Sequence, residues 1–206
     1  MATPTLKLVT PITAKRTVAP GRASNASYRE REHMTPAEVE RLLDGTGDHR
    51  NAHRDRTMIL IAYRHGLRAS ELCALKWSEI DLAAGLLHVR RAKGSAPSTH
   101  PLQGDELRAL RRLQRERAGA SPFVFVSERD APFTTAGFAR MIERAGRVAG
   151  FGYKIHPHML RHACGYALAN GGHDARRIAA WLGHRNLNNV TRYTALSPAA
   201  FENFWA

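Results

Sequence analysis

The stretch HPHMLRHACGYAL, residues 156–168, carries the strongest signals in this sequence for both the fold and the chemistry. Pro157 suits the first turn of a helix, and Leu160 and Cys164 recur at the spacing of a face that packs inward. His158 and Arg161 are three residues apart, so we expect both to point outward from neighbouring positions. A guanidinium offers paired donors to phosphate oxygens, and an imidazole adds a hydrogen bond or carries a proton. The pattern is compatible with a phosphate site, although a solvated surface has the same spacing.

The overall composition favours a nucleic-acid partner. Lys and Arg outnumber Asp and Glu by 31 to 18 in 206 residues, giving a formal net charge of +13 that attracts polyanions over long range. The length and the 43% hydrophobic content suffice for one main core. No run approaches the roughly 20 apolar residues that span a bilayer, and the first residues lack a secretory apolar run. We therefore expect a cytoplasmic protein without membrane association, whose two cysteines are buried thiols.

The hydrophobic periodicity predicts a mainly α domain with a small antiparallel β-sheet. Residues 1–33 show little periodicity and are expected to form a flexible basic arm, and residues 34–206 to form the folded domain. The first helix should begin after Thr35, which can form a capping box with Glu38. The other expected helices cover residues 54–66, 70–77, 105–117, 134–148, 157–170 and 174–182. The run LLHVRRAKGSAPSTHPL, residues 86–102, predicts a β-hairpin with Lys93 near its tip.

Further candidate residues recur in order along the chain, at predicted junctions and turns. GLRASEL, residues 66–72, places Arg68 between two helices, and AKG places Lys93 in the hairpin turn. WLGHRN places His184 just after a helix, and VTRYTAL contains Tyr193. Each of these residues also has a purely structural interpretation. Arg68 could pair with Glu71 and Lys93 could be an ordinary turn lysine. His184 could cap the preceding helix, and Tyr193 could simply pack.

Taken together, these motifs resemble the tyrosine recombinase family, also called phage-type integrases. Catalytic domains of that family carry Arg, Lys, His-x-x-Arg, His or Trp, and a terminal Tyr in this order. The matching positions here are Arg68, Lys93, His158, Arg161, His184 and Tyr193. The likeness spans roughly residues 34–198, and it is strongest to the short bacterial recombinases that invert the fimbrial promoter switch. Most integrases also carry an amino-terminal helical domain, whereas only the 33-residue arm is expected here.

The resemblance implies a recombinase that cleaves and rejoins DNA through a 3′-phosphotyrosyl intermediate on Tyr193. A phenol with a pKa near ~10 needs proton removal and a positive environment to attack at neutral pH. Arg68 and Arg161 would bind the two nonbridging oxygens of the phosphate. Glu71 is expected to brace Arg68, because a carboxylate beside the phosphate would oppose its binding.

The remaining roles concern protons and partners. The resemblance implies that Lys93 protonates the leaving 5′ oxygen, that His158 takes or relays the tyrosine proton, and that His184 holds the phosphate. His156 and His162 match no catalytic position and are expected to serve structure or DNA-backbone contact. The implied partners are double-stranded DNA, further copies in a homotetramer on DNA, and accessory DNA-bending proteins.

No metal or cofactor is expected. The acidic residues are scattered rather than clustered as divalent-metal ligands, and no GxxxxGK[ST] phosphate loop occurs. The favoured outcome is inversion of a DNA segment between inverted repeats. Two alternatives stay open at this point: a type IB topoisomerase, and a non-enzymatic DNA-binding regulator on a decayed recombinase fold.

Overall fold

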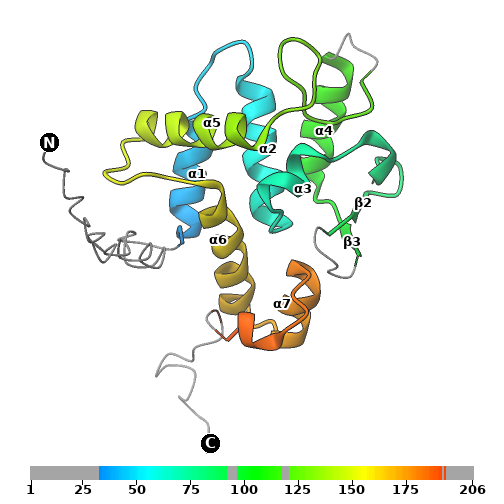
Figure 1. Ribbon diagram of the computed structural model, residues 1–206, viewed down its shortest axis with the longest axis vertical. Coiled ribbons are helices and arrows are strands. Elements are labelled where there is room, and N and C mark those ends of the chain that lie inside the picture. Colours follow the sequence, from blue (N-terminus) through cyan, green and yellow to red (C-terminus); the bar gives the residue numbers. More distant parts are fainter. Residues whose placement is uncertain (1–32, 92–96, 117–120, 192, 194–206) are drawn as a thin grey trace, which may run out of the picture. The chain divides into compact units, whose positions relative to one another are not determined.

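The computed structural model describes residues 33–91, 97–116, 121–191 and 193. Nearly all of the expected arm, Lys93 and the segment after Tyr193 lie outside these residues. The described part is mainly helical with a three-stranded antiparallel sheet, which confirms the predicted fold class (Figure 1). Among the described residues, no helix is long and apolar enough to cross a membrane.

The helices lie close to their predicted positions. They are α1 (Pro36–Asp44), α2 (Ala52–Arg64), α3 (Ala69–Cys73), α4 (Gly104–Glu116), α5 (Thr135–Val148), α6 (Pro157–Asn170) and α7 (Ala175–Leu182), with short 3-10 turns η2 (Trp77–Glu79) and η3 (Leu187–Asn189). The predicted capping box is present at α1, where the backbone N–H of Thr35 donates to Glu38 Oε2 at 2.8 Å. Such a box satisfies two of the backbone donors that a helix start leaves open.

The sheet consists of β1 (Ile80–Asp81), β2 (Leu86–Val89) and β3 (Ser98–Pro101) in that order. The pairing of β2 with β3 is antiparallel, from Leu86 opposite Pro101 to Val89 opposite Ser98. This confirms the predicted hairpin, in which Lys93 belongs to the connection between the two strands. The two-residue strand β1 has no matching signal in the sequence analysis.

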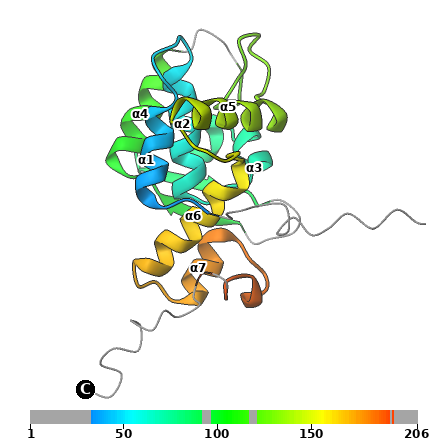
Figure 2. The ribbon, with the colours of Figure 1, turned by 90° about the vertical axis from the view of Figure 1, so that its left-hand side faces the viewer.

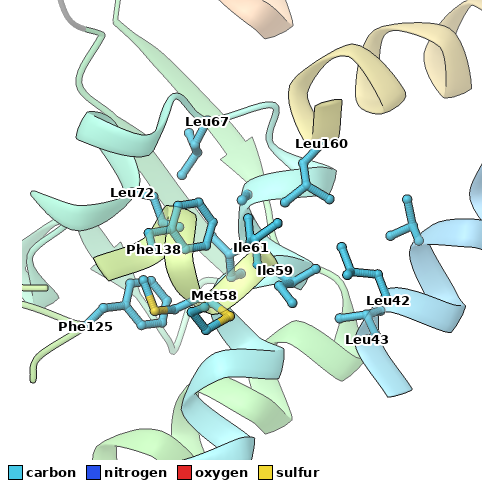
Figure 3. Close-up of a cluster of buried hydrophobic side chains, with 14 of the residues drawn as sticks. Leu42, Leu43, Met58, Ile59, Ile61, Leu67, Leu72, Phe125, Phe138 and Leu160 are labelled. Carbon is cyan, nitrogen blue, oxygen red and sulfur yellow. The ribbon is translucent and has the colours of Figure 1, made fainter. Parts of the chain in front are cut away.

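The main hydrophobic core is built by α1, α2, α3, α4, α5, the first half of α6 and the strand β2. Leu42, Met58, Ile61, Phe138 and Leu160 are essentially inaccessible to solvent and converge in one cluster (Figure 3). Burying each such side chain contributes about 1.5–3 kcal/mol. This core gives α6 a rigid base, from which its second half continues.

The second half of α6 packs into a smaller cluster with α7. Buried Cys164 on α6 meets Ile178 and Leu182 of α7, and Tyr193 belongs to the same cluster. Figure 2 shows α6 continuing beyond α1 and α2 to reach α7. Both cysteines are free and buried, as predicted, and burial raises the pKa of Cys73 to about 11 and that of Cys164 to about 12. The small cluster therefore brings the end of the described chain back onto α6.

Candidate active site

Arg161 is the largest fully buried side chain, so the expectation that it points outward beside His158 is wrong. Its Nη1 donates to the carbonyl of Gly66 and its Nη2 donates to the carbonyl of Leu182 at 2.6 Å. The guanidinium thus ties the end of α2 to the end of α7. Burial, with the nearby charges of Arg68 and Arg91, lowers the pKa of Arg161 to about 10.

Gly66 shows why this junction forms as it does. It has a left-handed φ of +57°, and a Cβ there would lie 2.3 Å from Leu182 Cδ2. Only glycine accepts this conformation and this close approach without strain. The motif GLR therefore turns the chain sharply, presents the Gly66 carbonyl to Arg161, and starts α3 at the next residues.

Arg68 precedes α3 and is held by Glu71, as predicted. The Arg68 Nη1 donates to Glu71 Oε1 at 2.6 Å, and the Arg68 backbone N–H donates to Glu71 Oε2 at 2.9 Å. About a third of the Arg68 side chain is exposed, whereas Glu71 is buried. Part of the Arg68 side chain therefore stays accessible to solvent although Glu71 holds it.

The sequence makes Arg91 a candidate for contact with DNA backbone phosphates, whereas the structure gives it contacts inside the protein. Its side chain is fully buried, and its Nη1 donates to the other side of Glu71 at 3.1 Å. Its Nη2 donates to the carbonyls of His65, at 3.3 Å, and Trp181. Because burial lowers the pKa of Arg91, these acceptors are what allow a charged group to stay inside.

His184 lies beside Arg161. It follows Gly183, which ends α7 in the left-handed region, and its backbone N–H donates to the Ala179 carbonyl at 2.8 Å. Its Nε2 is 3.4 Å from Arg161 Nη2, and the side chain is partly exposed. The end of α7 therefore places an imidazole at the edge of the buried guanidinium.

His158 occupies the exposed side of α6, unlike Arg161. Its ring meets the ring of His162 edge to face, with centroids 4.5 Å apart. The two histidines are one helical turn apart, which explains why they touch. His158 is thereby connected to the tyrosine through its neighbour.

Tyr193 is buried against α6 rather than extended into solvent. Its hydroxyl is 2.9 Å from Nδ1 of His162, and its ring meets that of Tyr166 edge to face. Gly165 lies directly beneath the ring, since a Cβ there would be 2.7–2.8 Å from three ring carbons. The expected roles of His162, structure or DNA-backbone contact, do not include this contact with Tyr193. The signal available in the sequence was that His162 lies four residues after His158, which is one helical turn.

The described residues thus bring together Arg68, Arg161 and His184, with Tyr193 packed against the adjoining part of α6. Lys93 falls in 92–96, outside the described residues, so its place relative to this cluster stays a prediction. Within the described parts of the chain, no group of three or more His, Cys, Asp or Glu side chains could hold a metal ion.

Arg68, Arg161 and Tyr193 on this fold indicate the class of protein, and comparison with known proteins establishes that class. Residues 32–200 match the model of the phage integrase family. The chain belongs to that family and is by class a tyrosine recombinase, an enzyme that breaks and rejoins DNA strands.

Its relatives include two regulators of similar length from Escherichia coli (strain K12). The chain is 41% identical over 181 residues to type 1 fimbriae regulatory protein FimE, covering 85% of this chain and 91% of FimE. It is 38% identical over 186 residues to type 1 fimbriae regulatory protein FimB, covering 88% of this chain and 93% of FimB.

A solved structure supports the same class. The crystal structure of XerA recombinase matches with a TM-score of 0.72 and 28% identity over 84% of this chain. The matched part is 63% of the XerA chain, so this chain spans under two thirds of that protein.

Proposed function

We propose that this chain is a site-specific recombinase that cleaves double-stranded DNA through a 3′-phosphotyrosyl link to Tyr193 and then rejoins it. The observation that carries the proposal is the cluster of Arg68, Arg161 and His184 around one junction, with the hydroxyl of Tyr193 in contact with His162, the residue that follows Arg161 on α6. Cleavage of a phosphodiester needs a nucleophile and neutralisation of the charge that develops on phosphorus-bound oxygens. The cluster provides both kinds of group.

The two arginines take the charge in this proposal. Arg68, partly exposed and braced by Glu71, binds one nonbridging oxygen. Arg161 binds the other; because its guanidinium is buried and donates to the carbonyls of Gly66 and Leu182, this contact requires that DNA binding uncover it. Charge-assisted bonds of this kind are roughly twice as strong as neutral ones.

Proton transfer and phosphate positioning fall to the remaining candidates. His184 hydrogen-bonds the scissile phosphate beside Arg161, and Lys93 protonates the leaving 5′ oxygen. His158 belongs to the path of the tyrosine proton through its contact with His162. The phosphotyrosyl ester keeps the energy of the broken bond, so a 5′ hydroxyl from another strand can reseal it.

The biological reaction we propose is inversion of a DNA segment between inverted repeats. The likeness to two regulators of type 1 fimbriae over nearly their whole lengths supports this choice. Solved recombinases of similar fold include XerH bound to its difH substrate, which supports duplex DNA as the partner. We propose further that four copies assemble on DNA with accessory DNA-bending proteins, in the cytoplasm. Residues 34–206 would form the catalytic domain and residues 1–33 the arm.

Covalent capture tests the proposal. The full-length protein is mixed with lightly nicked genomic DNA, so that some cleaved sites lose the short fragment needed for religation. DNA that survives denaturation on the wild-type protein and is absent from Tyr193→Phe identifies the nucleophile, and sequencing the attached ends reveals the site. Attachment without site preference, together with relaxation of supercoils, would favour a topoisomerase. Retention by neither protein, or equally by both, would contradict the proposal.

A further inference from the structure

The hydroxyl of Tyr193 and Nδ1 of His162 are 2.9 Å apart, within a buried part of the molecule. This is the range in which a side chain can act as general base toward a phenol. His162 immediately follows Arg161 on α6, and the ionised phenol of Tyr193 is among the charges that raise the pKa of Arg161. Proton acceptor, nucleophile and phosphate-binding guanidinium are therefore close neighbours.

We propose that His162 is a catalytic residue, namely the base that takes the phenol proton of Tyr193 as the phenol attacks phosphorus. The inference rests on the proposed function, since it assumes that Tyr193 is the nucleophile. It assigns the first proton transfer to a residue next to the matched His-x-x-Arg pair, not to His158.

The proton balance of the step is simple. The O–H bond of Tyr193 breaks and its proton passes to His162 Nδ1, while the phenol oxygen forms a bond to phosphorus. The bond from phosphorus to the 5′ oxygen breaks, and that oxygen receives its proton from the general acid. On rejoining, His162 returns its proton to the departing phenol. No oxidant, reductant or further reactant is required.

The reaction also specifies the protonation state of His162. A neutral imidazole has one donor nitrogen and one acceptor nitrogen, so Nδ1 can accept only when the ring proton lies on Nε2. Acid places a proton on Nδ1 and removes the acceptor. Cleavage should therefore fall as pH decreases through the titration of His162.

The surroundings of the pair hold other groups that can affect this titration. They are His158, Arg161 and Tyr166 on α6, Tyr63 on α2, His184 after α7, and His33, which stacks on Tyr166. Among these, His158 touches the ring of His162 edge to face. In this proposal His158 acts on the tyrosine proton only through His162, which makes it a positioning residue.

The glycine beneath the ring of Tyr193 supports the same assignment. Gly165 is inside α6, where glycine is about 1 kcal/mol less favourable than alanine. A Cβ at this position would collide with the ring of Tyr193. The helix therefore has, one turn after His162, the one residue type that lets the ring lie flat enough for its hydroxyl to reach Nδ1.

The test measures single-turnover cleavage across a range of pH. The substrate is the duplex recovered by covalent capture, nicked a few nucleotides to the 3′ side of the cleavage point so that cleavage is irreversible. His162→Asn keeps a hydrogen-bonding atom near the Nδ1 position but does not accept a proton at neutral pH. His162→Phe removes both functions, His158→Asn tests the neighbouring ring, and His173→Asn changes an exposed histidine as the matched control.

We expect His162→Asn to cleave about 100-fold more slowly or worse, the usual contribution of a general base, and to lose the fall in rate at acid pH. His162→Phe should be at least as slow, His158→Asn should keep the acid fall, and His173→Asn should match the wild type. A His162→Asn rate within a few fold of wild type would overturn the inference. Faster cleavage by either His162 variant would also overturn the inference, since it would mean that the contact with His162 holds the phenol in an inactive position.

Two further measurements keep the result decisive. Tyr193→Phe is assayed in parallel: if it still attaches DNA, the proposed function fails, and if it is inert beside a fast His162→Asn, only this inference fails. Should the His162 variants not fold, the Tyr193 Cζ resonance of ¹³C-tyrosine wild-type protein is followed against pH. It should shift in step with the His162 ring signals, and independence of the two titrations would contradict the assignment.

Discussion

Nη1 of Arg91 lies 3.1 Å from Oε2 of Glu71, and both side chains are almost entirely shielded from water. Glu71 is at the same time the brace of Arg68. Arg91 follows β2 and also donates to the carbonyl of Trp181 on α7. One buried ion pair thereby connects the hairpin, the Arg68 junction and the helix that presents His184.

Arg91→Met should destabilise the fold by about 3–5 kcal/mol, because it leaves buried carbonyls and one side of Glu71 without their charged donor. The free energy of unfolding from urea titrations checks this value. Arg50→Met provides the matched control, since Arg50 pairs with Glu128 on the surface and such pairs contribute at most about 1 kcal/mol. Equal losses in the two variants would show that the buried pair has no special weight.

Gly165→Ala should destabilise the protein by about 1–3 kcal/mol through overpacking against Tyr193, despite the better helix propensity of alanine. The same substitution in a Tyr193→Ala background has no ring to meet and should be neutral or stabilising. Thermal or urea unfolding of the four proteins gives this double-mutant cycle. A similar loss in the free energy of unfolding in both backgrounds would show that the new methyl group does not collide with Tyr193.

Stability should fall in acid because of His100. Burial, then His65 and Arg91, lowers the pKa of His100 to about 3, whereas an imidazole in the unfolded chain titrates near ~6.5. The unfolded chain therefore binds more protons between these values, and stability present above about pH 6.5 is lost as pH falls toward 3.

Urea unfolding at several pH values tests this expectation with His100→Asn. The variant keeps a polar atom toward His65, whose Nδ1 is 3.1 Å from that of His100, but it does not titrate in this range. Its free energy of unfolding should decline less steeply than that of the wild type, by up to about 1.4 kcal/mol per pH unit. Parallel declines would mean that His100 is not the group responsible.

Arg68→Met and Arg161→Met should separate binding of the phosphate from support of the fold. Both should lower single-turnover cleavage by about 100-fold or more, because each removes a charged donor to the transition state. Arg161→Met should also lower the free energy of unfolding by about 2–4 kcal/mol, since Arg161 is buried between two carbonyls. The loss in Arg68→Met should be smaller, because Arg68 is partly exposed and Glu71 keeps its contact with Arg91. An equal loss of stability in the two variants would contradict the assignment of Arg68 to the substrate rather than to the fold.

Local signals in the sequence were sufficient for most of the fold. Thr35 with Glu38, Pro157, Gly66 and Gly183 mark helix ends by capping and backbone preferences that depend on a few adjacent residues. The alternation in 86–102 likewise predicted the pairing of β2 with β3. The ordered motifs also identified the family and the order of the candidate site residues.

Tertiary structure alone decided which faces of α6 are covered and what meets there. Helical spacing places His158 and Arg161 near each other, but it does not show that the α2–α3 junction and α7 enclose Arg161 while His158 stays exposed. The contact between His162 and Tyr193 joins residues 31 positions apart, and that of Arg91 with Trp181 joins residues 90 apart. Such contacts depend on how separate elements pack together, whereas the sequence determined each element and its chemistry through neighbours a few residues away.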